Sequence, residues 1–179
     1  MGECRLLEGK FVNLRITEKE DLPLVAEWIN NLDFWGKFNP FHQMSKTDMQ
    51  KAYDMPSEER WFLIEKKDGS KVGNIGHRPV GTAQEIAFAV LPSERKKGYC
   101  SEAVMMMVDY LFLSKVIVRV QAHTDVRNEN FQKVLEKIGF KKEGIVRNAA
   151  FFWGKWRDGF LYSILREEWK EPKILTTKT

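Results

Sequence analysis

Cysteine and long apolar stretches are both scarce in this sequence. Cys4 and Cys100 are the only cysteines among 179 residues, too few for a disulfide scaffold, and no Cys/His cluster has metal-ligand spacing. No apolar run approaches the roughly 20 residues that span a bilayer, and residues 1–10 lack the apolar core of a signal peptide. We therefore expect a cytoplasmic protein without a metal ion or a membrane partner.

The composition is that of an ordinary globular protein, with 43% hydrophobic and 30% charged residues. Its length favours one domain, which we place at residues 1–170. Residues 171–179 show no periodicity and are expected to form a disordered tail. The net charge is +4, but the basic residues are not interleaved with aromatic ones along any single element. We therefore do not expect a nucleic acid partner.

Hydrophobic periodicity predicts several short strands separated by helices. Asp68-Gly69 is a hairpin signal between two of the strands. The strands are expected at residues 11–16, 60–66, 72–77, 85–91, 116–123, 143–150 and 159–165. Helices are expected after a capping box at Thr17 and Glu20, after Ser45, at 102–113 with Ser101 as N-cap, and at 128–138 before Gly139.

The order of these elements is β-α-α-β-β-β-α-β-α-β-β. It predicts an α/β domain with one mixed, mainly antiparallel sheet flanked by helices. Two strand–helix–strand connections near the middle of the chain imply some parallel pairing.

Three adjacent cations, Arg95, Lys96 and Lys97, precede Gly98 at the expected start of a helix. A helix N-terminus offers free N–H groups and partial positive charge to an anion, and glycine permits close backbone approach. A basic turn before a helix is, however, more often a solvated connection. The chain lacks both the nucleoside-triphosphate run Gly-x-x-x-x-Gly-Lys-Ser/Thr and the dinucleotide run Gly-x-Gly-x-x-Gly.

Residues 91–103, Leu-Pro-Ser-Glu-Arg-Lys-Lys-Gly-Tyr-Cys-Ser-Glu-Ala, resemble the acetyl-CoA loop of the GNAT superfamily of N-acetyltransferases, whose pattern is Gln/Arg-x-x-Gly-x-Gly/Ala. Residues 128–140 resemble the superfamily's second signature, an Asn-led helix ending in Glu-Lys-x-Gly-Phe. Residues 154–158 and 165–169 are similar to the ribosomal-protein N-terminal acetyltransferase (RimJ/RimL) type. The resemblance extends from Gly9 to about Trp169.

This resemblance implies a GNAT fold whose fourth and fifth strands, here residues 85–91 and 116–123, splay apart to admit acetyl-CoA. It implies that strand backbone at Phe88, Ala89 and Val90 contacts the pantetheine arm and the thioester. Asn128 would contact the same arm. The pyrophosphate would be bound by amides of Lys96, Lys97, Gly98, Tyr99, Cys100 and Ser101, in a loop shaped by Arg95.

Two positions depart from the family pattern. Cys100 stands where the family prefers Gly or Ala; its side chain is small, so the loop should survive, although a reactive thiol is an alternative. Phe131 stands where related enzymes often carry Ser facing the cofactor sulfur. A phenyl ring cannot protonate a leaving thiolate, so the sequence names no general acid.

The resemblance implies direct attack of a neutral amine on the thioester. At pH 7, deprotonating a lysine-like amine costs roughly 4–5 kcal/mol, whereas an α-amine costs only about 1 kcal/mol. Glu85, which opens the cofactor strand, is the candidate general base; the alternative is an exposed strand-edge carboxylate. His77 and His123 lie at strand ends, where a histidine could relay a proton or simply face solvent.

Aromatic side chains gather in residues 33–44, which include Phe41, and in residues 151–153. Trp35, His42 and Trp153 are the candidate acceptor contacts, with core packing as the alternative. We expect acetyl transfer to a primary amine, most simply a protein or peptide N-terminus. The alternatives are a small amine (a polyamine, amino sugar or aminoglycoside) or an acyl-CoA-binding module without turnover. The resemblance also allows a homodimer.

Overall fold

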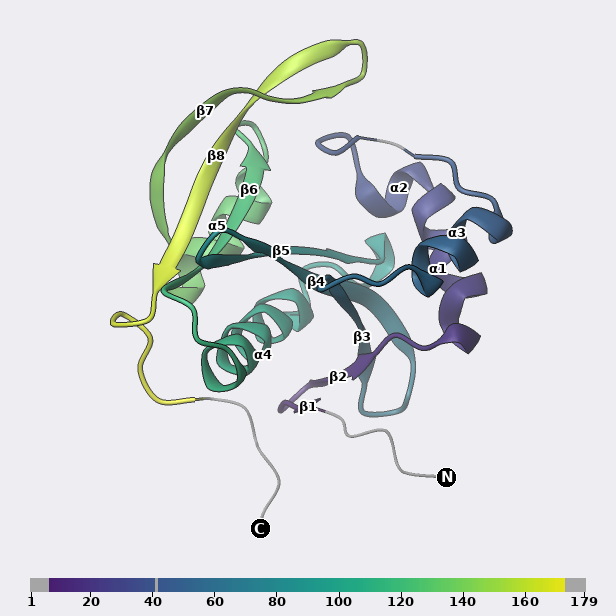
Figure 1. The fold of residues 1–179 in the computed structure, drawn as a ribbon, viewed down its shortest axis with the longest axis horizontal. Coiled ribbons are helices and arrows are strands. Elements are labelled where there is room, and N and C mark those ends of the chain that lie inside the picture. The colour runs from purple at the N-terminus through teal and green to yellow at the C-terminus, as the bar shows by residue number, and fades with distance from the viewer. Residues whose placement is uncertain (1–6, 41, 173–179) are drawn as a thin grey trace.

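The computed structural model describes residues 7–40 and 42–172. Across these residues, eight strands form one sheet in the order β1-β2-β3-β4-β5-β6-β8-β7 (Figure 1). The strands are β1 (Leu7–Glu8), β2 (Val12–Ile16), β3 (Arg60–Lys66), β4 (Lys71–Val80), β5 (Ala83–Val90), β6 (Arg119–Asp125), β7 (Lys141–Phe152) and β8 (Lys155–Leu165). Every neighbouring pair is antiparallel except β5 and β6, so the expected mixed, mainly antiparallel sheet is confirmed.

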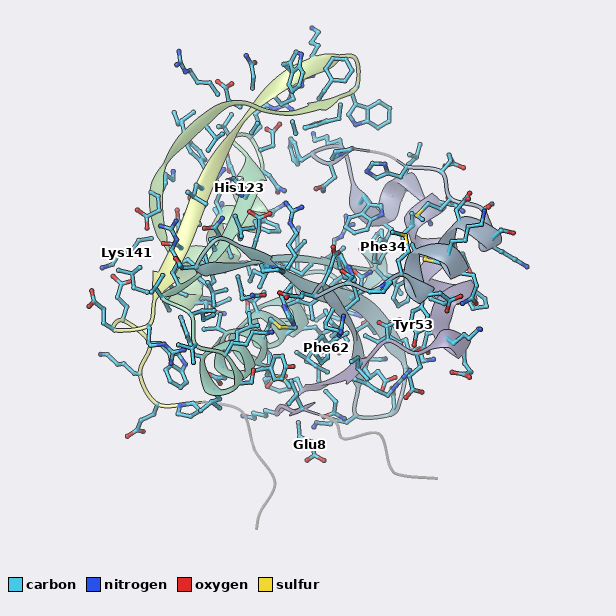
Figure 2. All side chains as sticks on the ribbon, viewed as in Figure 1. Glu8, Phe34, Tyr53, Phe62, His123 and Lys141 are labelled. Atoms are coloured by element: carbon cyan, nitrogen blue, oxygen red, sulfur yellow. The ribbon has the colours of Figure 1, made fainter. Side chains whose placement is uncertain are left out.

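The helices cover both faces of the sheet. They are η1 (Lys19–Asp21), α1 (Leu22–Asn30), α2 (Leu32–Trp35), α3 (Lys46–Asp54), η2 (Pro92–Glu94), α4 (Tyr99–Ser114) and α5 (Glu129–Ile138). The main core lies on the face covered by α4 and α5 and includes Phe62. A second cluster packs Trp28 and Phe34 of α1 and α2 against Leu63 of β3. Figure 2 shows Phe34 beside these helices and Phe62 on the α4 side.

Local signals in the sequence place several element ends correctly. Gly69 adopts φ +82° in the β3–β4 turn, and Ser45 caps α3 in a reciprocal capping box with Asp48. Asn128 caps α5, which ends at Gly139 with φ +106°. In each case a side chain or a glycine satisfies the helix or turn end without help from distant residues.

The two other predicted caps are wrong. The first helical segment opens at Glu18 rather than Thr17, because Asp21 reaches back to accept from the Glu18 N–H. Asp21 is held there by Arg15 and Lys71, contacts that arise only in the folded chain. Helix α4 starts two residues before the predicted Ser101 cap.

Residues 116–123 alternate in the sequence, but the strand there begins only at Arg119. Val116 is fully exposed and Val118 is half exposed, so the first residues of the predicted strand lie outside the core. The carbonyls of Lys115 and Ile117 instead accept hydrogen bonds from Arg166, a partner far along the chain. Residues 116–118 therefore form a connecting segment that precedes the strand.

Of the two strand–helix–strand connections, only the first creates a parallel pair. Strand β5 pairs directly with β6 across α4. After α5, however, β8 lies between β6 and β7, so β7 becomes the sheet edge. No helix in the described part of the chain is long and apolar enough to cross a membrane. Phe41 and residues 173–179 of the expected tail lie outside the described residues.

Candidate active site

Strands β5 and β6 diverge in the middle of the sheet. They pair only from Ala83 opposite Arg119 to Glu85 opposite Gln121. Beyond Glu85, β5 continues to Val90 while keeping its pairing with β4, including Phe88 and Ala89. The β6-facing edge of β5 therefore presents backbone groups that no neighbouring strand pairs, which is the geometry expected of a splay that admits an extended ligand.

An aromatic stack lies beside this splay. The rings of Phe88 on β5 and Phe131 on α5 are nearly parallel, 8° apart, with centroids separated by 4.2 Å. Phe131 thus packs its ring where the resemblance would place a hydroxyl. Neither side chain of the stack can transfer a proton.

The loop before α4 has the backbone shape of an anion site. Gly98 is the helix N-cap with φ +88°, and Lys96 is also left-handed with φ +64°. Helical hydrogen bonding begins with Glu102, whose N–H donates to the Gly98 carbonyl at 3.2 Å, so earlier amides point out of the helix end. Open space surrounds the position that a Cβ of Gly98 would take. These features fit the diphosphate of acetyl-CoA.

Two of the three cations in this loop are engaged within the protein. The Arg95 guanidinium turns inward and donates to the carbonyls of Val90, Asp33 and Phe34 at 2.8 to 3.1 Å. Lys97 pairs with Glu94 at 3.0 Å. Arg95 thereby ties the loop to the end of β5 and to α2, consistent with the expected loop-shaping role.

Cys100 packs against the main core. Burial raises the pKa of its thiol to about 12, with Arg95 lowering it only partly. A thiol with a raised pKa is a weak nucleophile at neutral pH, which favours the interpretation of Cys100 as a small packing residue over a reactive cysteine.

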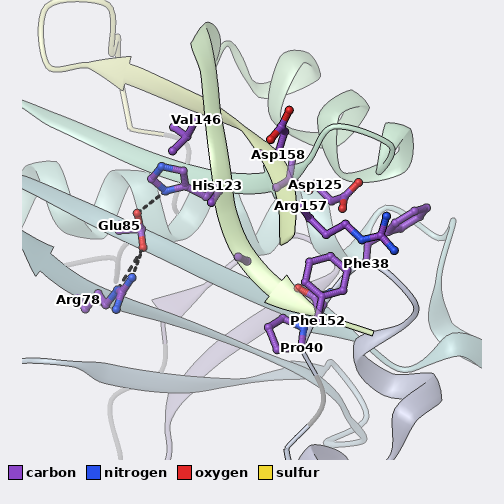
Figure 3. Close-up of a pocket in the computed structure, with 15 residues that line it drawn as sticks. Phe38, Pro40, Arg78, Glu85, His123, Asp125, Val146, Phe152, Arg157 and Asp158 are labelled. Atoms are coloured by element: carbon purple, nitrogen blue, oxygen red, sulfur yellow. Dashed lines mark hydrogen bonds and ion pairs between the residues drawn. The ribbon is translucent and has the colours of Figure 1, made fainter. Parts of the chain in front are cut away.

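Glu85 is the centre of a polar cluster on the sheet face opposite α4 (Figure 3). Its carboxylate accepts from Arg78 at 2.6 Å and lies 2.6 Å from His123 Nδ1 and 3.3 Å from Gln121. Burial by itself raises the pKa of Glu85, but hydrogen bonds from His123, Arg78 and Gln121 outweigh it and lower the pKa to about 2. Glu85 is thus a fixed anion rather than an exposed strand-edge carboxylate.

Two adjoining cavities, of about 300 and 290 Å³, open on this face. Both are lined by Glu85 and Arg78 of the sheet and by Asn39 and Pro40 from the α2–α3 connection. Glu85 therefore lies where the two cavities meet.

Two of the three candidate acceptor contacts line a cavity, and the third does not. Trp35 and His42 line the second cavity. Trp153 enters the β7–β8 turn with φ +52°, is nearly half exposed, and lines neither cavity. Phe152, the last residue of β7, lines the first cavity instead.

Several site residues were not found from the sequence. The tight β4–β5 turn pairs Val80 with Ala83, and this register places Arg78 opposite Glu85. Gly81 in that turn is the sequence signal that could have predicted the pair. Arg157 reaches the first cavity from β8, and nothing in the local sequence indicates it. His77 also lines the second cavity, but its ring packs near Tyr110 of α4 and lies 2.7 Å from the Gln84 side chain of β5.

Comparison with known proteins decides the family. The acetyltransferase (GNAT) domain matches residues 12–141. The chain belongs to the GNAT acetyltransferase family. It is therefore an N-acetyltransferase, an enzyme of class EC 2.3.1.

Relatives in this family are named for different acceptors. A putative ribosomal N-acetyltransferase of Bacillus subtilis (strain 168) is 29% identical, covering 97% of this chain and all of the relative. Spermidine N(1)-acetyltransferase of Escherichia coli (strain K12) is 27% identical over 88% of each chain. The structure of a spermidine N-acetyltransferase from Vibrio cholerae in complex with CoA and spermine matches with TM-score 0.78 and 22% identity, over 88% of this chain and 96% of that one, and shares the fold.

Proposed function

We propose that this GNAT enzyme transfers the acetyl group of acetyl-CoA to the α-amine at the N-terminus of a peptide or protein. The observation that carries the proposal is the pairing of the carboxylates around the two cavities. Glu85 is paired with Arg78, and Asp125 is paired with Arg127 at 2.7 Å. The first cavity also contains the cation Arg157.

A polyamine carries several positive charges, each of which needs a carboxylate when it leaves water. In these cavities Asp158 already accepts from the Asn148 N–H, and Glu59 accepts from the Trp61 indole. Such a surface suits a single amine better than a polycation. The similarity to proteins named for spermidine and for ribosomal substrates is nearly equal, so identity favours neither acceptor.

We assign removal of the amine proton to the Glu85–His123 pair. A carboxylate with a pKa near 2 is a poor base at neutral pH, whereas imidazole is the side chain best suited to accept a proton there. Because the Glu85 carboxylate can only accept, His123 Nδ1 donates to it, leaving Nε2 to receive the proton. Glu85 is then the residue that orients His123, a change from its expected role as the base itself.

On the donor side, the loop amides from Lys96 to Ser101 bind the diphosphate, and the free edge of β5 at Phe88, Ala89 and Val90 positions the pantetheine arm. Asn128 contributes through its place at the α5 N-terminus, where its side chain already accepts from the Phe131 N–H at 3.3 Å. Solvent supplies the proton for the leaving thiolate, because the Phe88–Phe131 stack cannot.

The test is a thiol-release assay with acetyl-CoA and three acceptor classes: peptides with free N-termini, polyamines, and aminoglycosides. We expect the highest kcat/KM with peptides, and no activity with N-terminally blocked peptides. His123→Gln should lower kcat by about 10²-fold or more. Higher kcat/KM with spermidine or spermine than with any peptide would overturn the proposal.

A further inference from the structure

Arg157 is a cation of the first cavity that forms no direct ion pair with a carboxylate of the described residues. It lies on β8 and lines the cavity opposite Glu85 and His123 (Figure 3). Its Nε is fully buried and has no hydrogen-bond partner among the described residues. None of their carboxylates forms an ion pair with its guanidinium. A buried guanidinium N–H without a protein partner is costly, which favours a water or a ligand group that accepts from it.

The acids nearest to Arg157 are already engaged. Asp125 accepts from Arg127 through Nε, Nη2 and the backbone N–H, at 2.7, 2.7 and 2.9 Å. Asp158, the next residue on the strand, accepts from the Asn148 N–H at 2.9 Å. The other cation of this cavity, Arg78, is paired with Glu85. Arg157 only adds a charge effect that helps to lower the pKa of Asp125. It is therefore the cation of this cavity that is left to pair directly with a ligand carboxylate.

The Arg157 side chain is also held in position. Its guanidinium carbon lies 5.9 Å from the centroid of the Phe152 ring, and Phe152 is almost completely buried. Stacking on an aromatic face leaves the edge N–H groups of a guanidinium free. A planar fork of this kind matches a carboxylate, which can accept two parallel hydrogen bonds.

We propose that Arg157 binds a carboxylate of the acceptor and makes the enzyme selective for acidic N-terminal sequences. This inference rests on the proposed transfer to a peptide α-amine. Since Arg157 and the Glu85–His123 pair line one cavity of about 300 Å³, the carboxylate lies within a few residues of the reacting amine. It is supplied by an Asp or Glu side chain near the N-terminus or by the C-terminus of a very short peptide.

The experiment compares eight-residue peptides that differ at one position. Each starts with Ser and has an amidated C-terminus, and positions 2, 3 and 4 in turn carry Asp, Asn or Lys. For the best position, we expect the wild-type enzyme to favour Asp over Asn by at least tenfold in kcat/KM. A Ser-Ala dipeptide is compared as the free acid and as the amide. A preference for the free acid would show that Arg157 binds a C-terminal carboxylate rather than a side-chain carboxylate.

Arg157→Gln should reduce the preference for Asp over Asn to less than about twofold, because kcat/KM falls more for the Asp peptide than for the Asn peptide. Arg157→Lys, which keeps the charge but not the fork, should retain part of it. Arg147→Gln changes an exposed arginine of β7 that does not line the first cavity. It is the matched control and should behave as wild type.

Equal activity of the wild type on Asp and Asn peptides, with either carboxylate source, would overturn the inference and leave the proposed function intact. Loss of folding in Arg157→Gln does not remove this test, because the wild-type preference is measured alone. Absence of activity on every peptide would instead overturn the proposed function itself.

Discussion

Glu85 joins three strands through its side chain. Arg78 on β4 and both Gln121 and His123 on β6 contact one carboxylate that is only 12% exposed. The pairing of β5 with β6 ends at this residue, so the cluster also closes the base of the splay. Glu85 thus contributes to stability as well as to the proposed proton transfer.

The lowered pKa of Glu85 predicts how stability depends on pH. The folded state holds the carboxylate at a pKa of about 2, below its ordinary 4.5, so its contribution is complete above about pH 4.5 and is lost as the pH falls toward 2. Relative to Glu85→Gln, the wild type should be more stable by an order of 1–3 kcal/mol at pH 6, and this difference should disappear near pH 2.

Urea unfolding followed by circular dichroism at several pH values measures this difference. Glu129→Gln is the control, because Glu129 makes only an exposed pair with Lys133 on α5 and should change stability little at any pH. A Glu85→Gln effect that is the same at pH 6 and pH 3 would show that the carboxylate is not held as described.

At the scale of elements, the connection from β5 to α4 combines several roles in few residues. Arg95 fixes its start to Val90 and α2, and Gly98 turns the chain into the helix. Glu102, in the first turn, accepts from the backbone N–H groups of Lys10, Phe11 and Val12. The loop amides are thereby held from both sides before any ligand binds.

Gly98→Ala should weaken acetyl-CoA binding. At φ +88° an alanine is strained by about 1–2 kcal/mol, although its Cβ would meet no atom within 4 Å. The backbone should relax and move the amides, raising the Kd for acetyl-CoA at least about fivefold by calorimetry.

Gly144→Ala is the matched control for this substitution. A Cβ at Gly144 also meets open space, and no left-handed φ is required there. Unchanged acetyl-CoA affinity in Gly98→Ala would mean that the amides of this loop do not bind the diphosphate.

Individual helices, strands and turns also show which features the sequence could predict. The helix starts near Ser45 and Asn128 and the turn at Gly69 depend on neighbours within a few residues, and all three are confirmed. The start of β6 was misplaced because Arg166 holds the preceding carbonyls. The acetyl-CoA loop was found through its resemblance to the family, whereas Arg157 could not be, since its surroundings depend on a hairpin that folds back over the cavity.

For the whole molecule, the sheet consists of two parts joined at a narrow contact. Strands β1 to β5 form one part and β6, β8 and β7 the other, and only residues 83–85 of β5 pair across. Beyond this contact, the parts are connected by packing of α4 and α5 in the main core. A ligand that binds in the splay would contact both parts and should stabilise their association.

Acetyl-CoA should therefore protect a defined region of the chain. At 100 times its Kd it adds about 2.7 kcal/mol of stability, which corresponds to a rise in melting temperature of roughly 5–10 °C for a domain of this size. In hydrogen exchange, protection should increase at residues 86–90 and 96–101 and at the start of α5, but not in β2 or β3. Pantetheine, which lacks the diphosphate, should protect residues 86–90 alone, and 3′,5′-ADP should protect residues 96–101 alone. Protection spread evenly over all strands would indicate general stabilisation and would contradict binding in the splay.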